Sequence, residues 1–269
     1  MTAELFAFTL TLGAGAATGL GAALVLVTHR NNPVLLSAAL GFSAGVMVYV
    51  SFLEILPKAT ETLSGSNPAS ASALATTGFF GGVLLAAVID RLMPEAPSPQ
   101  DLEPLAAKDA GAPGGAPSNQ QLKQLGLFTA LALALHNFPE GIATFLTGLA
   151  DQTLAIPLAV AIGIHNIPEG IAVAIPLYYA TGSRTKAFWW ALASGLTEPL
   201  GALLGWLILG PVLTDALFGV VFAMVAGIMV FISLDKLLPA ATRYGSHKLT
   251  MQSMFAGMAV MALSLLILN

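Results

Sequence analysis

One eight-residue phrase occurs twice in the sequence and carries side chains that bind metal ions. The two copies are His136-Asn137-Phe138-Pro139-Glu140-Gly141-Ile142-Ala143 and His165-Asn166-Ile167-Pro168-Glu169-Gly170-Ile171-Ala172. They are 29 positions apart (136 to 165) and identical at seven of eight positions. Residues four apart share one face of a helix, so the histidine and the glutamate of each copy point the same way. The asparagine is rotated by about 100° and faces a second, adjacent position.

A third carboxylate, Glu198, stands near the middle of another apolar run. An ionisable acid at the centre of a bilayer costs about 2.5–3.5 kcal/mol. No Lys or Arg lies within the inner part of any apolar run to neutralise the three glutamates, whereas a divalent cation would. Imidazole, amide and carboxylate ligands together suit zinc, iron, manganese or cobalt ions, while Cu(I) prefers sulfur.

The proline in each copy weakens the helix around the phrase. Pro139 and Pro168 lack an N–H, and each ring clashes with the carbonyl four residues earlier, at Leu135 and Ile164. We expect helices broken at this depth, which membrane proteins tolerate where the break lines a cavity. A single histidine or asparagine in a span more often bonds to another helix, and protonated glutamates without metal are a further interpretation. The duplicated set favours a metal site.

The composition places these residues in a lipid bilayer. Of 269 residues, 56% are hydrophobic and 9% charged, and the mean hydropathy is +0.82. A soluble domain has about a quarter of its residues charged. The net charge is −4 and no basic stripe exists, so we expect no nucleic-acid partner. The absence of cysteine excludes disulfides, thiolate metal sites and thiolate catalysis.

Eight apolar runs are long enough to cross about 30 Å of hydrocarbon, which takes about 20 residues. They are Leu5–Thr28, Val34–Pro57, Leu74–Ile89, Leu125–Ala150, Leu154–Ala180, Ala187–Leu209, Leu213–Leu234 and Met251–Leu268. Nine of the ten Lys and Arg residues follow odd-numbered runs, and only Lys58 lies on the other side. Positive charge favours the cytoplasmic side. We therefore expect odd runs to end in the cytoplasm and both termini to lie outside it.

The connections between the runs complete a single transmembrane domain over residues 1–269. The fourth and fifth runs form a hairpin turning near Asp151, which puts His136 and His165 at nearly the same depth, close to the bilayer midplane. The segment at about 94–121 holds six prolines and three glycines and is expected to be a disordered cytoplasmic loop. The Ser-rich segment Thr60–Ser72 is expected to be a second, shorter flexible loop.

Two such phrases followed by Glu198-Pro199, in a chain of eight runs, resemble the ZIP family of divalent-metal transporters and its bacterial ZupT-like branch. The resemblance covers the whole chain. It implies an all-α fold in which runs one to three are related to runs six to eight by an inverted repeat around the central hairpin. The similar ends of the second and seventh runs, Leu53–Pro57 and Leu234–Pro239, are a short trace of that inversion.

The resemblance also implies a function and a ligand set. The function is import of zinc, iron, manganese or cobalt through the bacterial inner membrane, with the ion as substrate, no separate cofactor, and a homodimer among the expected partners. One site would use His136, Glu140, His165 and Glu169. An adjoining site would use Asn137, Glu140, Asn166, Glu169 and Glu198, so that two glutamates bridge a binuclear centre. Met47 of the second run is an additional candidate.

Two other classes of protein remain to be compared with a carrier. A divalent-cation channel would use the same ligands. An intramembrane metallohydrolase would need an open metal position and a general base, typically in an HExxH motif, which the sequence lacks. We therefore expect a transporter and not an enzyme.

Overall fold

The computed structural model of the protein describes residues 2–27, 33–66, 68–92, 119–150, 152–212 and 214–268. Every regular element in these segments is helical, as the all-α prediction requires. The α-helices are α1 (Ala3–Val27), α2 (Pro33–Val50), α3 (Leu56–Ser66), α4 (Ala71–Leu92), α6 (Asn119–Ala150), α7 (Gln152–Thr181), α8 (Arg184–Gly195), α9 (Thr197–Leu209), α10 (Asp215–Ile232), α11 (Leu238–Tyr244) and α12 (His247–Leu268).

Seven helical segments among the described residues are long and apolar enough to cross a membrane. They are Ala3–Leu24, Ser37–Gly65, Ala71–Arg91, Gln152–Ile171, Arg184–Ile208, Asp215–Arg243 and His247–Ile267. The chain is therefore a multi-pass membrane protein. Helix α6 is 32 residues long but is not among the seven, and its middle contains the polar residues His136, Asn137 and Glu140. The eighth span thus stays a prediction.

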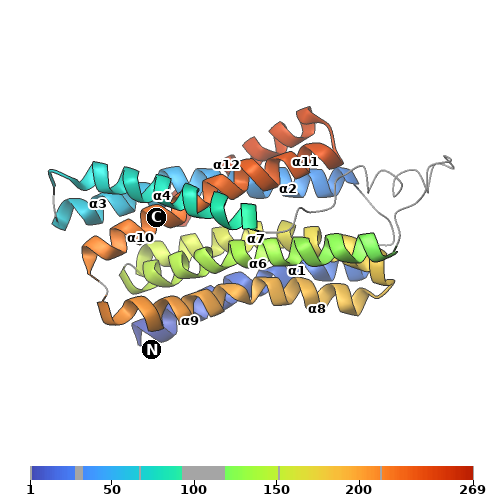
Figure 1. The fold of residues 1–269 in the computed structure, drawn as a ribbon, viewed down its shortest axis with the longest axis horizontal. Helices are drawn as coiled ribbons and strands as arrows, with labels where there is room; N and C mark the ends of the chain where they lie inside the picture. Colours follow the sequence, from blue (N-terminus) through green and yellow to red (C-terminus); the bar gives the residue numbers. More distant parts are fainter. Residues whose placement is uncertain are drawn as a thin grey trace.

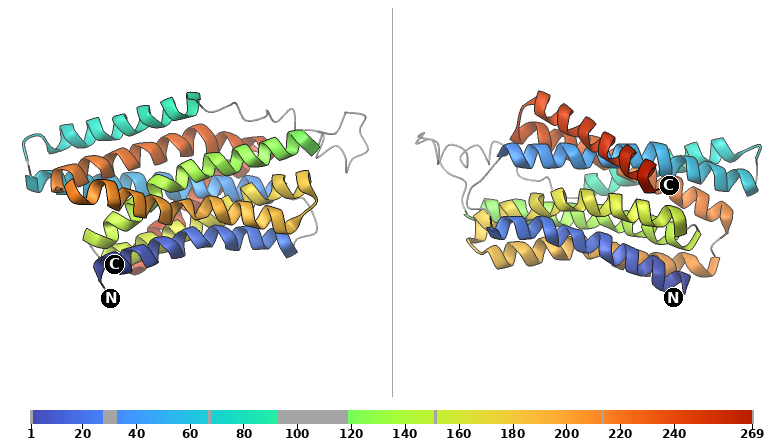
Figure 2. Two further views of the ribbon diagram at one scale, coloured as in Figure 1. Left: turned by 60° about the horizontal axis from the view of Figure 1, so that its bottom comes forward. Right: turned by 180° about the vertical axis from the view of Figure 1, so that it is seen from behind.

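The helices form two groups that lie side by side (Figures 1 and 2). One group contains α1, α6, α7, α8 and α9, and the other contains α2, α3, α4, α10, α11 and α12. The groups touch where α2 and α12 meet α7 and where α10 meets α6. Both ends of the chain lie toward the same end of the bundle (Figure 2). Both copies of the repeated phrase belong to the first group.

Large apolar side chains point outward from both groups. On α4, Phe80 and Leu84 are 63% and 65% exposed, and on α12 Leu266 and Ile267 are each 78% exposed. An apolar surface of this kind is unfavourable in water but matches the hydrocarbon interior of a membrane.

The second and seventh spans continue through their prolines because each contains a π-helical turn. These turns are Ser51–Ile55 and Ser233–Leu237. A π turn inserts one extra residue into the helix, which accommodates the missing N–H and the bulky ring of Pro57 or Pro239 just beyond it. The helices then run on as α3 and α11. For this reason the helices do not end with the predicted runs, at Pro57 and Leu234.

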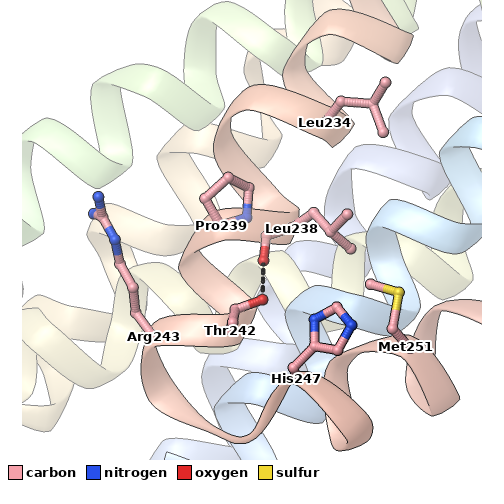
Figure 3. Close-up of a pocket in the computed structure, with 7 residues that line it drawn as sticks. All are labelled: Leu234, Leu238, Pro239, Thr242, Arg243, His247 and Met251. Carbon is pink, nitrogen blue, oxygen red and sulfur yellow. Dashed lines mark hydrogen bonds between the residues drawn. The ribbon is translucent and has the colours of Figure 1, made fainter.

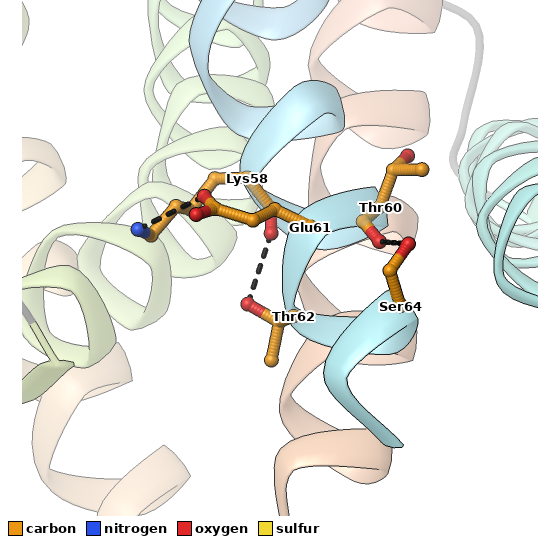
Figure 4. A network of polar contacts seen from close by, with 5 residues as sticks. All are labelled: Lys58, Thr60, Glu61, Thr62 and Ser64. Atoms are coloured by element: carbon orange, nitrogen blue, oxygen red, sulfur yellow. Dashed lines mark hydrogen bonds and ion pairs between the residues drawn. The ribbon is translucent and has the colours of Figure 1, made fainter. Parts of the chain in front are cut away.

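The segment Thr60–Ser72, predicted as a flexible loop, is helical as far as Ser66. Its hydroxyls donate to helix carbonyls four residues earlier, as from Thr62 to Lys58 at 2.9 Å and from Ser64 to Thr60 at 2.8 Å (Figure 4). These bonds satisfy the hydroxyls within the helix. The many Ser and Thr residues of this segment therefore do not indicate a loop. The other predicted loop, at about 94–121, lies outside the described residues except for its last three, which begin α6.

The helix breaks expected at Pro139 and Pro168 are absent, since α6 and α7 run through both residues without interruption. The break lies in the sixth span instead, at Leu196 between α8 and α9, where ψ is −5°. Pro199 follows in the first turn of α9, where its missing N–H costs no intrahelical hydrogen bond. This break determines where Glu198 stands.

Glycines let the backbones of α1, α6, α7, α8 and α9 come into direct contact. A Cβ atom at Gly15 would lie 2.5 Å from the carbonyl oxygen of Gly195, and one at Gly195 would overlap that of Gly15. Likewise, a Cβ at Gly141 would overlap the carbonyl oxygen of Glu198, and one at Gly170 would overlap that of Thr18. No side chain fits at these contacts, which is how small residues serve helix packing in membranes.

Candidate metal site

Five of the seven predicted ligands are fully buried in the first group of helices. Asn137 and Glu140 belong to α6, Asn166 and Glu169 to α7, and Glu198 to the first turn of α9, and each is 0% exposed. The buried residues that the structure describes include no Lys or Arg. A buried charge without a partner of opposite sign is strongly unfavourable. The cluster is therefore a candidate site for a cation or for protons.

Asn166 joins three helices through its amide nitrogen. Its Nδ2 donates to the carbonyl oxygen of Ala14 on α1 at 2.8 Å and also to Oε1 of Glu198 on α9. Because the nitrogen is engaged on both sides, the orientation of the amide is fixed. Its Oδ1 has no hydrogen-bond partner among the described residues and is left to accept or to coordinate.

Asn137 is held in the same manner from α6. Its Nδ2 donates to the carbonyl oxygen of Ser194 at 3.2 Å, at the end of α8. Its Oδ1 likewise has no partner in the described part of the chain. Both asparagines thus use nitrogen to fix a neighbouring backbone and present oxygen, which is the atom that could bind a metal ion.

Glu198 interacts electrostatically with two other carboxylates and lies at the start of a helix. One carboxylate oxygen accepts from Asn166, while Oε2 has no hydrogen-bond partner among the described residues. The carboxylate lies within electrostatic range of Glu140 and Glu169. Its place in the first turn of α9 sets it near the positive end of that helix dipole, which favours an anion there.

The start of α9 is anchored to α6 by the residue before Glu198. The single hydrogen of Thr197 Oγ1 is shared between the carbonyl oxygen of Ala134, at 2.9 Å, and that of Ser194. These bonds satisfy carbonyls beside the break at Leu196, where the regular helix pattern is interrupted. The break and its hydroxyl partner therefore place Glu198 beside the phrase on α6.

The structure brings part of the predicted set together. Glu198 contacts Asn166 directly, while the backbones of His136 and His165 lie in α6 and α7, one helical turn before Glu140 and Glu169. The side chains of the two histidines lie outside the described residues. Among the side chains that are described, no three of His, Cys, Asp or Glu form a group that could hold a metal ion. A site would therefore need the asparagine oxygens or the histidines as well.

The structure bears on two further buried residues, Met47 on α2 and Thr18 on α1. Met47 is fully buried in the main hydrophobic core cluster, so its packing explains its burial without a metal. Thr18 on α1 was not among the candidates. It is also fully buried, and its Oγ1 has no hydrogen-bond partner among the described residues.

A surface groove and an ion-pair cluster are formed by residues outside the predicted ligand set. The groove, of about 400 Å³, is lined by Leu234, Leu238, Pro239, Thr242, Arg243, His247 and Met251 (Figure 3). Its lining holds no carboxylate and is therefore unsuited to a divalent cation. In the cluster, Lys236 Nζ lies 2.5 Å from Asp90 and 3.1 Å from Asp235, so these two acids are paired within the protein.

Comparisons with known proteins agree on one family. The family model described as "ZIP Zinc transporter" matches residues 96–265. The chain is similar to a protein of Streptococcus mutans named "Zinc transporter ZupT", with 50% identity over 269 residues and 99% of each chain covered. Proteins of the same name from Chlorobium phaeovibrioides and Corynebacterium glutamicum are each 52% identical, with 97% or more of both chains covered.

Proposed function

Because the chain belongs to the ZIP family of metal transporters, we propose that it carries divalent transition-metal ions, zinc foremost, into the bacterial cytoplasm. The similar proteins are named zinc transporters, which supports zinc as a substrate. Iron, manganese and cobalt are proposed as further substrates, since nitrogen and oxygen ligands accept all of these ions. The ions are cargo, and we propose no cofactor and no catalytic step.

The observation that carries this proposal is the buried polar cluster of α6, α7 and α9. Glu140, Glu169 and Glu198 are fully buried in a membrane protein, and the described segments bury no Lys or Arg. Glu198 lies within electrostatic range of each of the other two glutamates. Two asparagine oxygens and one carboxylate oxygen there have no hydrogen-bond partner in the described segments. A divalent cation would satisfy both the charges and these oxygens.

We propose two adjoining metal positions with shared glutamates. The first would use His136, Glu140, His165 and Glu169, and the second would use Asn137, Glu140, Asn166, Glu169 and Glu198. The turn-by-turn spacing of histidine and glutamate on α6 and α7 supports the first position. The fixed amides and the contact between Asn166 and Glu198 support the second.

We propose further that the single transmembrane domain has eight spans, with α6 as the fourth, and an inverted repeat. The reciprocal contact between Gly15 and Gly195 supports the repeat, since an element and its inverted copy meet at equivalent positions on the axis that relates them. The π turns of the second and seventh spans, each followed by Leu-Pro, support it independently. In this arrangement both termini lie outside the cytoplasm, the loop at about 94–121 is cytoplasmic and disordered, and a homodimer is compatible with the exposed apolar surface.

Uptake into proteoliposomes tests the function and separates it from a channel. We expect zinc influx, followed by a trapped fluorescent indicator, to saturate with zinc concentration and to be competed by the other transition metals. Glu140→Ala removes a residue of both proposed positions and should abolish influx, with the exposed Glu61→Ala as a matched control. Flux linear in zinc concentration would favour a channel, and unchanged flux in the Glu140 variant would disprove the site.

A further inference from the structure

Thr18 is a buried polar residue that the proposed ligand set does not contain. Its side chain is 0% exposed, and its Oγ1 has no hydrogen-bond partner among the described residues. Thr11, on the same helix and equally buried, instead donates to the carbonyl of Ala7 at 2.9 Å. A buried hydroxyl left without a bond is unfavourable, so Thr18 needs an explanation, as do Ser37, Ser43 and Ser51, whose buried hydroxyls also have no partner among the described residues.

The hydroxyl of Thr18 stands against Gly195 at the break in the sixth span, next to the residue that Asn137 contacts. A Cβ atom at Gly195 would lie 2.5 Å from Thr18 Oγ1. The residue before it, Ser194, accepts the hydrogen bond from Asn137 Nδ2 at 3.2 Å. Thr18 and Asn137 therefore flank two consecutive residues at the end of α8.

Glu198 has the equivalent place on the other side of the site. A Cβ atom at Gly15 would lie 3.3 Å from Glu198 Cβ, and the preceding residue, Ala14, accepts the hydrogen bond from Asn166 Nδ2 at 2.8 Å. Thr18 is three residues after Gly15, and Glu198 is three residues after Gly195.

The neighbouring glycines repeat this correspondence. The carbonyl oxygen of Glu198 meets the glycine of the phrase on α6, Gly141, and that of Thr18 meets the glycine of the phrase on α7, Gly170. Thr18 and Glu198 thus occupy equivalent places in the backbone, each beside the glycine that follows an asparagine-bound carbonyl, with a neutral hydroxyl on one side and a carboxylate on the other.

We propose that Thr18 Oγ1 is a further ligand of the asparagine-containing metal position and biases it toward ions that prefer six oxygen ligands. This inference rests on the proposed function and on the ligands assigned there. With Thr18, that position has six oxygen-bearing residues: Thr18, Asn137, Glu140, Asn166, Glu169 and Glu198. Mn²⁺ favours six oxygens in octahedral geometry, whereas Zn²⁺ is satisfied by four ligands. The hydroxyl should therefore matter more for manganese than for zinc.

Three variants of α1 test the inference in proteoliposomes. Thr18→Val keeps the shape of the side chain and removes the hydroxyl, while Thr18→Ser keeps the hydroxyl. We expect Thr18→Val to raise the KM for manganese uptake about tenfold, equivalent to about 1.4 kcal/mol, with the KM for zinc changed by less than about twofold. Thr18→Ser should resemble the parent protein. Thr11→Val, whose hydroxyl bonds within its own helix, should also leave both KM values unchanged.

The ratio of the two KM values separates ligation from packing. An equal rise of the KM for both metals in Thr18→Val would show that Thr18 acts through packing and would overturn the inference. Unchanged KM values in this variant, or a parent protein that takes up no manganese, would also overturn it. If Thr18→Val fails to accumulate, Thr18→Ala is judged by the same ratio. Glu169→Gln tests the proposed function separately. If it loses uptake of both metals while the threonine variants show no selective effect, only the inference about Thr18 fails.

Discussion

The two asparagines and the three glutamates contribute to the site through different atoms and different forces. Asn137 and Asn166 fix the backbones of α8 and α1 with their nitrogens, and each leaves an oxygen without a hydrogen-bond partner in the described structure. The glutamates supply negative charge in a region where the described part of the chain buries no positive side chain. The amides therefore determine geometry, and the carboxylates determine the charge that a cation must balance.

Replacing Asn166 by Asp tests this division at a single residue. The variant loses the donor to Ala14 and Glu198 and places a second carboxylate beside the first, so without metal we expect a loss of about 1–3 kcal/mol in unfolding free energy. Excess zinc should recover part of this loss, since metal binding to the folded state stabilises it. Thermal unfolding with and without zinc measures both effects. Gln152→Glu, exposed at the start of the same helix, is the control. An unfolding midpoint equal to that of the parent in metal-free buffer would contradict this account.

At the scale of helices, the sequence predicted what depends on local pattern and missed what depends on packing. Apolar runs located the membrane helices, and the duplicated phrase located the buried polar residues. The helix breaks predicted from the prolines were wrong, because whether a proline breaks a helix depends on the surrounding turns. A π turn absorbs Pro57 and Pro239, and the actual break precedes Pro199.

Thr18 was overlooked for a related reason. Its surroundings, Gly15-x-x-Thr18-x-x-Gly21, match Gly195-x-x-Glu198-x-x-Gly201 in spacing. Threonine and glutamate differ in chemistry, so the spacing alone does not indicate that the two residues are equivalent. The equivalence becomes visible only when α1 and α9 are seen to pack against the two copies of the phrase. The signal was therefore present in the sequence, but the pairing of helices that reveals it is a property of the fold.

The glycine contacts between helices lead to a second test of stability. A Cβ atom at Gly141 would overlap the carbonyl oxygen of Glu198, and neither backbone can yield without displacing α9. Gly141→Ala should therefore lower the unfolding midpoint strongly and abolish zinc uptake. An overpacked contact lowers the unfolding free energy by about 1–3 kcal/mol or more. Gly13→Ala is the matched control, since no atom lies within 4 Å of a Cβ there and alanine favours helix. Equal stability of the two variants would show that the helices are free to separate.

On the scale of the whole molecule, the charge pattern and the fold must agree on which helices cross the membrane. The element that decides this is α6, whose polar middle weakens the hydropathy signal of a span. The termini lie toward the same end of the bundle, as an even number of crossings requires (Figure 2). If α6 did not cross, every connection after it would change sides, and the inverted relation between the first three spans and the last three would fail.

The absence of cysteine allows this topology to be tested with one introduced thiol at a time. Glu61 on α3 and Lys186 in the first turn of α8 are both exposed. Helix α3 and the start of α8 lie toward opposite ends of the bundle in Figure 1. Three membrane crossings separate them if α6 is a span, and two if it is not. We therefore expect Glu61→Cys to react with a membrane-impermeant maleimide in intact spheroplasts, and Lys186→Cys to react only after permeabilisation. The reverse pattern would invert the orientation taken from the positive charges. Reaction of both thiols from the same side would show that α6 does not cross the membrane. Asn137 and Glu140 would then not lie at the bilayer midplane.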